Sequence, residues 1–219
     1  MKQKKRIIVN FKAYSEASGS KAQELADSFS EIAEKSESEI IVAPDLIDTI
    51  RTTGEGVKVY GQHVDPVRPG SHTGNITAEM LKASGASGTL LNHSEKRMEK
   101  EEVRQSLEAC KEAGLETVVC AQTVQEVEEL SDLGPDFVAF EPPELIGGDT
   151  SVSTARPGMI EDAVERTDEG VGTLTGAGIK DCEDVMKSIE LGCDGVLVAS
   201  GVVKSRKPVE RLENLCEGL

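Results

Sequence analysis

The sequence has no tryptophan, few aromatic residues and a shortage of basic side chains. Aromatic residues make up 3% of the 219 residues, and 24 Lys and Arg stand against 40 Asp and Glu, for a formal net charge of −16 at pH 7. Nucleic acids and anionic membranes attract basic patches, and unpaired bases stack on aromatic rings. The composition therefore argues against nucleic acid and membrane surfaces as partners.

The chain also lacks paired cysteines and clustered metal ligands. Its cysteines are odd in number, widely spaced and without a Cys-x-x-Cys motif; they are Cys110, Cys120, Cys182, Cys193 and Cys216. This pattern argues against a disulfide framework and a zinc knuckle, and Cys120 and Cys193 lie in or beside apolar runs, which predicts buried thiols. The three histidines, His63, His72 and His93, have no metal-ligand spacing, so we expect no metal site.

No apolar run is long enough to span a membrane. The basic residues 1–6 are followed only by Ile7-Ile8-Val9 before Asn10, which is too short for the apolar region of a signal peptide. We therefore expect a cytoplasmic protein. The acidic balance adds the hypothesis of a salty cytoplasm, in which case the melting temperature should rise between low and molar KCl.

Strand-like and helical segments alternate along the whole chain. Short apolar runs predict buried strands at residues 6–10, 39–44, 57–62, 88–92, 116–121, 136–140, 171–175 and 195–199. Apolar residues at helical spacing predict helices at 20–35, with Ser20 as N-cap, and at 45–51, 77–83, 101–113, 124–130, 157–165, 181–191 and 208–216. Eight such units favour a single (β/α)8 barrel domain over residues 1–219.

A doubly wound open sheet is the alternative fold. It would place a Gly-x-Gly-x-x-Gly turn after its first strand, where this chain has Asn10-Phe11-Lys12-Ala13. In a barrel, functional side chains belong at the carboxyl ends of the strands. These ends carry Asn10, Lys12, Gln62, His63, Asn92, His93 and Glu141. The turns 176–178 and 200–201 follow the seventh and eighth predicted strands.

Glu141 lies where a rigid strand meets a loop of unusual composition. Pro142 and Pro143 follow it at once and end the strand, and Gly147 and Gly148 come shortly afterwards. A stiff hinge, a short tip and a free hinge are what a closing lid requires, which makes Glu141 a candidate active-site carboxylate. The alternative is a solvated carboxylate at a strand end.

Three further features have a functional and an ordinary interpretation. The glycine-rich turns 176–178 and 200–201, with 202–205 as a short helix, could bind phosphate through backbone N–H groups, or could simply be tight turns. His93 precedes Ser94 and Glu95, which we interpret as a helix start that would keep the imidazole neutral; otherwise it is a structural hydrogen bonder. Lys12 could hold an anionic ligand or be a solvated lysine.

Three segments resemble the signature segments of the triosephosphate isomerase family. They are Asn10-Phe11-Lys12, Leu91-Asn92-His93-Ser94-Glu95-Lys96-Arg97 and Phe140-Glu141-Pro142-Pro143-Glu144-Leu145-Ile146-Gly147. The similarity is strongest to the short archaeal branch of the family and runs from the first predicted strand to the last. The resemblance implies interconversion of dihydroxyacetone phosphate and D-glyceraldehyde 3-phosphate through an enediolate, a step of glycolysis and gluconeogenesis, without a cofactor.

The resemblance also implies a role for each matching residue. Glu141 would be the base, His93 would polarise the substrate carbonyl, and Lys12 would hold the anionic substrate and stabilise the enediolate. Glu95 would pair with Lys12 and orient it. The substrate would be bound by Asn10, Phe11 and Lys12, and its phosphate by the backbone of Ile146, Gly178, Ala199 and Ser200, under a lid of residues 142 to about 150.

The chain departs from longer members of the family in two places. Glu144 and Leu145 stand where those members carry a lid tryptophan, and Gly176-Ala177-Gly178 stands where they carry Gly-Gly-Ser. Residues 70–74 resemble the segment that reaches into a neighbouring subunit. The resemblance to short archaeal members implies a homotetramer, with a dimer as the alternative. Two other functions stay open: a Schiff-base aldolase that uses Lys12, and a phosphosugar binder without catalysis.

Overall fold

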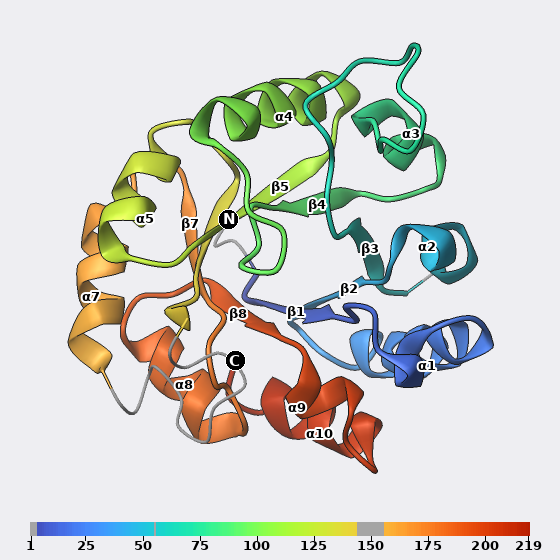
Figure 1. Ribbon diagram of the computed structural model, residues 1–219. Helices are drawn as coiled ribbons and strands as arrows, with labels where there is room; N and C mark the ends of the chain where they lie inside the picture. The colour runs from blue at the N-terminus through green and yellow to red at the C-terminus, as the bar shows by residue number, and fades with distance from the viewer. Residues whose placement is uncertain (1–3, 55, 144–155) are drawn as a thin grey trace.

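Eight parallel strands close into a barrel in which each strand pairs with its sequence neighbours and β1 pairs with β8 (Figure 1). This computed structural model describes residues 4–54, 56–143 and 156–219. The strands are β1 (Arg6–Asn10), β2 (Glu39–Ala43), β3 (Lys58–Gly61), β4 (Gly88–Leu91), β5 (Glu116–Ala121), β6 (Phe137–Phe140), β7 (Gly172–Thr175) and β8 (Gly195–Val198). The predicted barrel is confirmed, and the open-sheet alternative is wrong.

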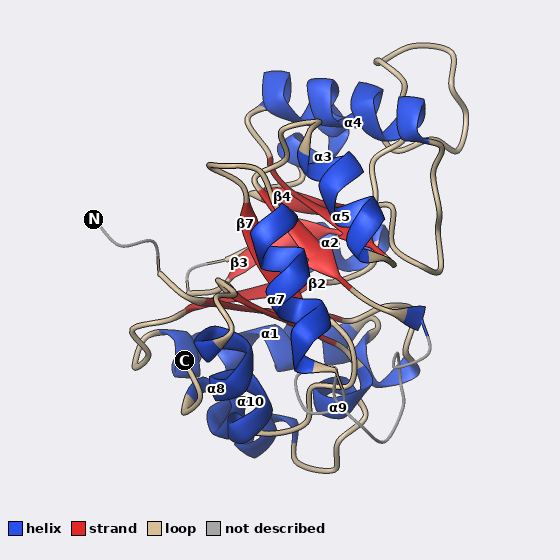
Figure 2. Cartoon of the chain, turned by 90° about the vertical axis from the view of Figure 1, so that its left-hand side faces the viewer, coloured by secondary structure: helices blue, strands red, loops and turns tan. Residues whose placement is uncertain are grey.

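Helices surround the strands on the outside, as the side view in Figure 2 shows. They are α1 (Ser20–Ala33), α2 (Leu46–Thr52), α3 (Ala78–Ala83), α4 (Lys100–Ala113), α5 (Val124–Ser131), α7 (Pro157–Arg166), α8 (Cys182–Glu190), α9 (Ser200–Val203) and α10 (Pro208–Cys216), with a 3-10 turn, η1 (Ser15–Ala17). Their bounds lie close to those predicted from apolar spacing. In the part of the chain described, none of these helices has the length and apolar character needed to cross a membrane.

Alternate residues of each strand face the barrel interior and the helices. On β1, Ile8 belongs to the interior cluster, whereas Ile7 and Val9 pack in the cluster that contains α1 and α10. The interior cluster takes one or two residues from each strand, among them Phe137 and Leu174. Because both faces are buried, the strands read as continuous apolar runs in the sequence.

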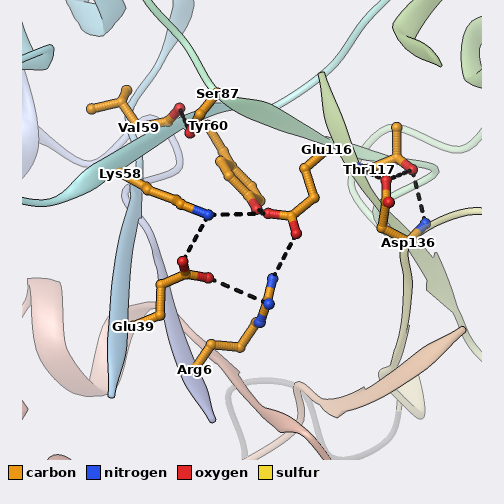
Figure 3. Close-up of polar contacts among 9 residues, drawn as sticks. All are labelled: Arg6, Glu39, Lys58, Val59, Tyr60, Ser87, Glu116, Thr117 and Asp136. Atoms are coloured by element: carbon orange, nitrogen blue, oxygen red, sulfur yellow. Dashed lines mark hydrogen bonds and ion pairs between the residues drawn. The ribbon is translucent and has the colours of Figure 1, made fainter. Parts of the chain in front are cut away.

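A network of polar side chains lies at the amino-terminal end of the barrel (Figure 3). Arg6 has a side chain only 4% exposed, and it pairs with Glu39 at 3.4 Å and Glu116 at 3.2 Å while its guanidinium lies 3.7 Å from the ring centre of Phe137. Lys58 also pairs with Glu39, at 2.7 Å. The end opposite the predicted site is therefore held by charge pairs around the buried Arg6.

Two local predictions are wrong. Ser20 is the first residue of α1 and not its cap: Gly19 is the N-cap, with φ of 66°, and its N–H donates to Asp48 Oδ2 at 2.7 Å. The short helix expected at 202–205 is α9, which begins two residues earlier, at Ser200. In the first case a contact from the neighbouring α2 replaces a local side-chain cap.

Candidate active site

The alternation of the strands brings two predicted site residues into the barrel mouth. Asn10 lies two residues beyond the inward-facing Ile8, and Glu141 lies four beyond the inward-facing Phe137, so both continue the interior set. Asn10 is 4% and Glu141 is 4% exposed. A carboxylate this deeply buried at a strand end is not the solvated loop residue of the alternative interpretation.

Lys12, Glu95, His93 and Glu141 form one chain of contacts across the mouth. Lys12 Nζ donates to Glu95 Oε1 at 2.9 Å, and Glu95 Oε2 lies 3.7 Å from His93 Nδ1. On the other side of the ring, His93 Nε2 lies 3.6 Å from Glu141 Oε2. Side chains from three strand ends and one loop, up to 129 positions apart in the sequence, thus meet at one place.

Two residues of the mouth hold a left-handed backbone that side chains usually avoid. The φ angles are 48° at Lys12 and 58° at Asn92, the two non-glycine residues with positive φ in the described ranges. The Lys12 N–H donates to Asn10 Oδ1 at 2.9 Å. Asn92 is tied by its amide to the Cys120 carbonyl at 2.9 Å and accepts the Met98 N–H at 3.0 Å. Strained backbone held by such bonds is common at functional sites.

His93 is neutral, but not for the reason that the sequence suggested. Residues 94–96 form a turn and no helix, closed by the Lys96 N–H on the His93 carbonyl at 2.8 Å. The Glu95 N–H donates to His93 Nδ1 at 3.1 Å, so the ring proton lies on Nε2. Burial, and then the charge of Lys12, lower the pKa of His93 to about 4. Its Nε2–H is thus available to a substrate oxygen.

Glu141 has the environment of a base that works near neutral pH. Burial raises its pKa to about 7, against smaller lowering effects from a hydrogen bond with the Cys120 thiol and from the charge of Lys12. Its Oε2 is buried without a hydrogen-bond partner in the structure. Gly176 leaves room for the carboxylate, since a Cβ there would lie 2.7 Å from Oε1. A base is most effective when its pKa is close to the working pH.

A cavity of about 330 Å³ reaches Lys12 and Glu95 at the barrel mouth, and most of the predicted phosphate-binding residues line it. It is lined by Lys12 together with Gly178, Ala199 and Ser200. Gly178 has φ of 73°, a conformation that favours glycine. Ser200 is the first residue of α9, whose first N–H groups have no carbonyl one turn earlier. The site therefore offers backbone donors and a lysine to an anion.

Three residues have contacts in this geometry that the sequence did not indicate, although Gly176 was considered there as part of a phosphate-binding turn. Lys180 lines the same cavity and adds a second cation. Gly176 makes the space for Glu141, and the buried Cys120, which was predicted only as a small apolar residue, hydrogen bonds to it. Gly176 and Cys120 lie just after or within a strand end, and that position alone does not reveal contacts between strands.

Two predicted substrate-binding residues need separate mention. The side chain of Phe11 is fully buried and packs edge-on against Phe29, with ring centres 6.4 Å apart, so only its backbone could face a ligand. Ile146, with the greater part of the expected lid at 142–150, lies outside the described residues.

Comparison with known proteins identifies the family of this chain. The family model for triosephosphate isomerase matches residues 5–217. Triosephosphate isomerase of Methanopyrus kandleri is 47% identical and that of Methanocaldococcus jannaschii 43%, over 97% and 95% of this chain and 97% of each relative. The crystal structure of triosephosphate isomerase from Bartonella henselae superposes with a TM-score of 0.77 at 20% identity, covering 99% of both chains, which supports the fold. The chain belongs to the triosephosphate isomerase family.

Proposed function

We propose that this chain interconverts dihydroxyacetone phosphate and D-glyceraldehyde 3-phosphate, a step of glycolysis and gluconeogenesis. The observation that carries the proposal is the chain of contacts that joins Glu141, His93 and Lys12, with Lys12 also lining the cavity at Gly178, Ala199 and Ser200. The family membership supports the same reaction. No cofactor is required, because a proton moves between two carbons of one molecule.

Each side chain has one task in this mechanism. The Glu141 carboxylate removes a proton from the hydroxyl-bearing carbon next to the carbonyl and returns it to the former carbonyl carbon, while the hydroxyl proton passes from one substrate oxygen to the other. His93 Nε2–H hydrogen bonds to the carbonyl oxygen and stabilises the negative charge that develops there. Lys12 stabilises the same charge and the phosphate, while Glu95 orients Lys12. Asn10 holds the backbone of Lys12.

The phosphate would bind to the backbone at Gly178, Ala199 and Ser200, with Lys12 supplying charge. We also propose that residues 142 to about 150 form a lid and that Ile146 contributes its N–H to the phosphate. Exclusion of water by such a lid would strengthen every electrostatic contact in the mouth.

A coupled assay of the interconversion tests the reaction directly. Glu141→Asp should reduce turnover by about 10²-fold with little change in KM, because a shorter side chain displaces the carboxylate by about 1 Å. Glu190→Asp on α8, at a side chain 57% exposed, is the matched control and should be unchanged. Unaltered turnover in Glu141→Asp would show that Glu141 is not the base.

The same experiments separate the two rival functions. An aldolase would form a covalent adduct on Lys12 when borohydride is added with dihydroxyacetone phosphate, and we expect none. A binder without catalysis would hold the triose phosphate but show no interconversion in the coupled assay.

We propose further that the protein is a homotetramer of the archaeal type, with a dimer as the alternative. Three apolar side chains on α2 and α3 support a subunit interface: Ile47, Ile50 and Met80 are 86%, 69% and 53% exposed. Exposed apolar residues on neighbouring helices often mark an interaction surface. Residues 70–74 would reach into the neighbouring subunit. Light scattering should give the mass of an oligomer, and Ile47→Lys should lower it; a monomer in the unaltered protein would contradict the proposal.

The remaining expectations complete this picture. We propose that residues 1–219 act as one domain and that the enzyme works in the cytoplasm on a small phosphorylated triose. Limited proteolysis followed by the activity assay tests the first expectation, and fractionation of source cells tests the second.

A further inference from the structure

Gln62 lies at the carboxyl end of β3 and reaches two neighbouring strand ends. Its Nε2 donates to the Lys12 carbonyl at 3.0 Å and to the Ala43 carbonyl at 2.9 Å. A carboxamide nitrogen has two hydrogens, so both are used. Two carbonyl acceptors also require the nitrogen of the amide, and not its oxygen, at this place. Gln62 therefore ties the ends of β1 and β2 to β3.

The contact with Lys12 falls on a backbone that needs support. Lys12 has φ of 48°, in the left-handed region that a residue with a Cβ rarely adopts. Its N–H is held by Asn10 Oδ1 and its carbonyl by Gln62 Nε2. The peptide groups on both sides of the Lys12 Cα are thus fixed by side chains from β1 and β3. With either bond removed, the residue could relax toward negative φ.

The direction of the Lys12 side chain depends on this backbone. Its Nζ reaches Glu95 Oε1 across the mouth, and the side chain is 11% exposed and lines the phosphate cavity. A change of φ at Lys12 swings the whole four-carbon stem away from that cavity. In a chain with net charge −16, each cation beside the substrate phosphate carries weight, and Lys180 is a second lysine that lines this cavity.

We propose that Gln62 is a positioning residue for Lys12: its two donated hydrogen bonds hold the strained backbone that aims the cation at the substrate. This inference rests on the proposed function. Gln62 lines a cavity of about 250 Å³ together with Lys12 and His93, but its described hydrogen bonds go to Lys12 and Ala43, and we therefore assign its effect on the reaction to Lys12.

The test is Gln62→Met, which keeps the length of the side chain and removes both donors. We expect kcat/KM to fall about 10- to 100-fold, because displacements of about 1 Å in a site cost this much. The rise of KM should be larger than the fall of kcat, since Lys12 binds the substrate anion. Gln62→Asn, which is too short to reach both carbonyls, should behave alike. Gln122→Met is the matched control: Gln122 follows β5 in the same way, and its described contact is through its backbone N–H.

A purely structural role is distinguished by a double substitution. If Gln62 acts through Lys12, then Gln62→Met should cause no further loss in a Lys12→Met background. An equal factor in both backgrounds, or wild-type KM and kcat in a folded Gln62→Met, would overturn the inference. Should the unaltered chain fail to interconvert the trioses, the proposed function fails. The positioning role is then decided by titration with inorganic phosphate, whose binding Gln62→Met must weaken; unchanged binding would overturn it.

Discussion

Replacing Gly176 by alanine should disable the base without unfolding the barrel. An alanine Cβ would lie 2.5 Å from Glu141 Cγ, 2.7 Å from Oε1 and 2.8 Å from Cδ. Unbonded carbon atoms prefer a separation of about 3.5–4.0 Å, so the carboxylate end must move by about 1 Å. Gly176 lies outside the positive-φ range, and its N–H bond to the Phe140 carbonyl at 3.0 Å is available to alanine as well. The backbone therefore tolerates the change.

The magnitude follows from which atoms meet. The added methyl group contacts the Cγ and the carboxyl group of a side chain that can rotate, so we expect the free energy of unfolding to fall by about 1–3 kcal/mol, as in other overpacked sites. A base displaced by about 1 Å from its productive position costs about 10²-fold in turnover. The coupled isomerase assay and urea unfolding measure the two effects on one preparation.

Gly158→Ala is the matched control, because a Cβ at Gly158, in the first turn of α7, meets nothing within 4 Å. It should keep both activity and stability. A folded Gly176→Ala variant with wild-type kcat would refute the argument that the missing side chain at this position sets the place of the carboxylate.

Three other outcomes follow from the charges. Burial raises the pKa of Glu141 from 4.5 to about 7, so this group favours folding below its unfolded pKa. That contribution to the free energy of unfolding, on the order of 3 kcal/mol, is lost as the pH rises through about 7. Glu141→Gln should therefore gain stability relative to wild type at about pH 9 but not at about pH 4, while wild-type kcat/KM should fall below about pH 7; an equal stability difference at both pH values would contradict this. Arg6→Met should lower the free energy of unfolding by about 3 kcal/mol with kcat unchanged, because Glu39 and Glu116 lose their most buried partner. Lys58→Met, at a side chain 44% exposed, is the control and should lower it by less than about 1 kcal/mol. Molar KCl should raise the melting temperature by screening the net charge of −16, and no rise would remove the hypothesis of a salty cytoplasm.

The barrel could be predicted because its strands carry a strong and local signal. Each strand is buried on both faces, so each reads as an apolar run, and helical spacing marks the segments between them. Helix caps are less predictable, since they depend on neighbours. Ser20 is a good cap by type, yet Asp48 from α2 stabilises the start of α1 through Gly19 instead.

The residues of the candidate site also fall into two groups: those that local sequence predicts and those that depend on contacts between distant segments. Asn10, Lys12, His93 and Glu141 could be predicted as site residues because they lie at or just after strand ends, and parallel strands bring their carboxyl ends to one edge of the barrel. The residues that position these groups could not be predicted from the sequence. Gly176 leaves space for Glu141 because it has no side chain, and Gln62 donates hydrogen bonds to the Lys12 and Ala43 carbonyls at the ends of two other strands. Such contacts depend on barrel register, which the alternation of apolar runs does not specify.

The physical cause of the neutral state of His93 determines which substitutions should change its protonation. A helix start at 94–95 would make the imidazole sensitive to charge in the first turn, but this segment is a turn, and burial is the main cause of the lowered pKa. Glu95 opposes that shift through its charge and donates to Nδ1 through its backbone N–H, which every residue except proline supplies. Glu95→Gln should therefore leave a neutral ring with its proton on Nε2, as nitrogen NMR of the imidazole would show. An imidazolium at neutral pH in that variant would mean that burial does not govern the site.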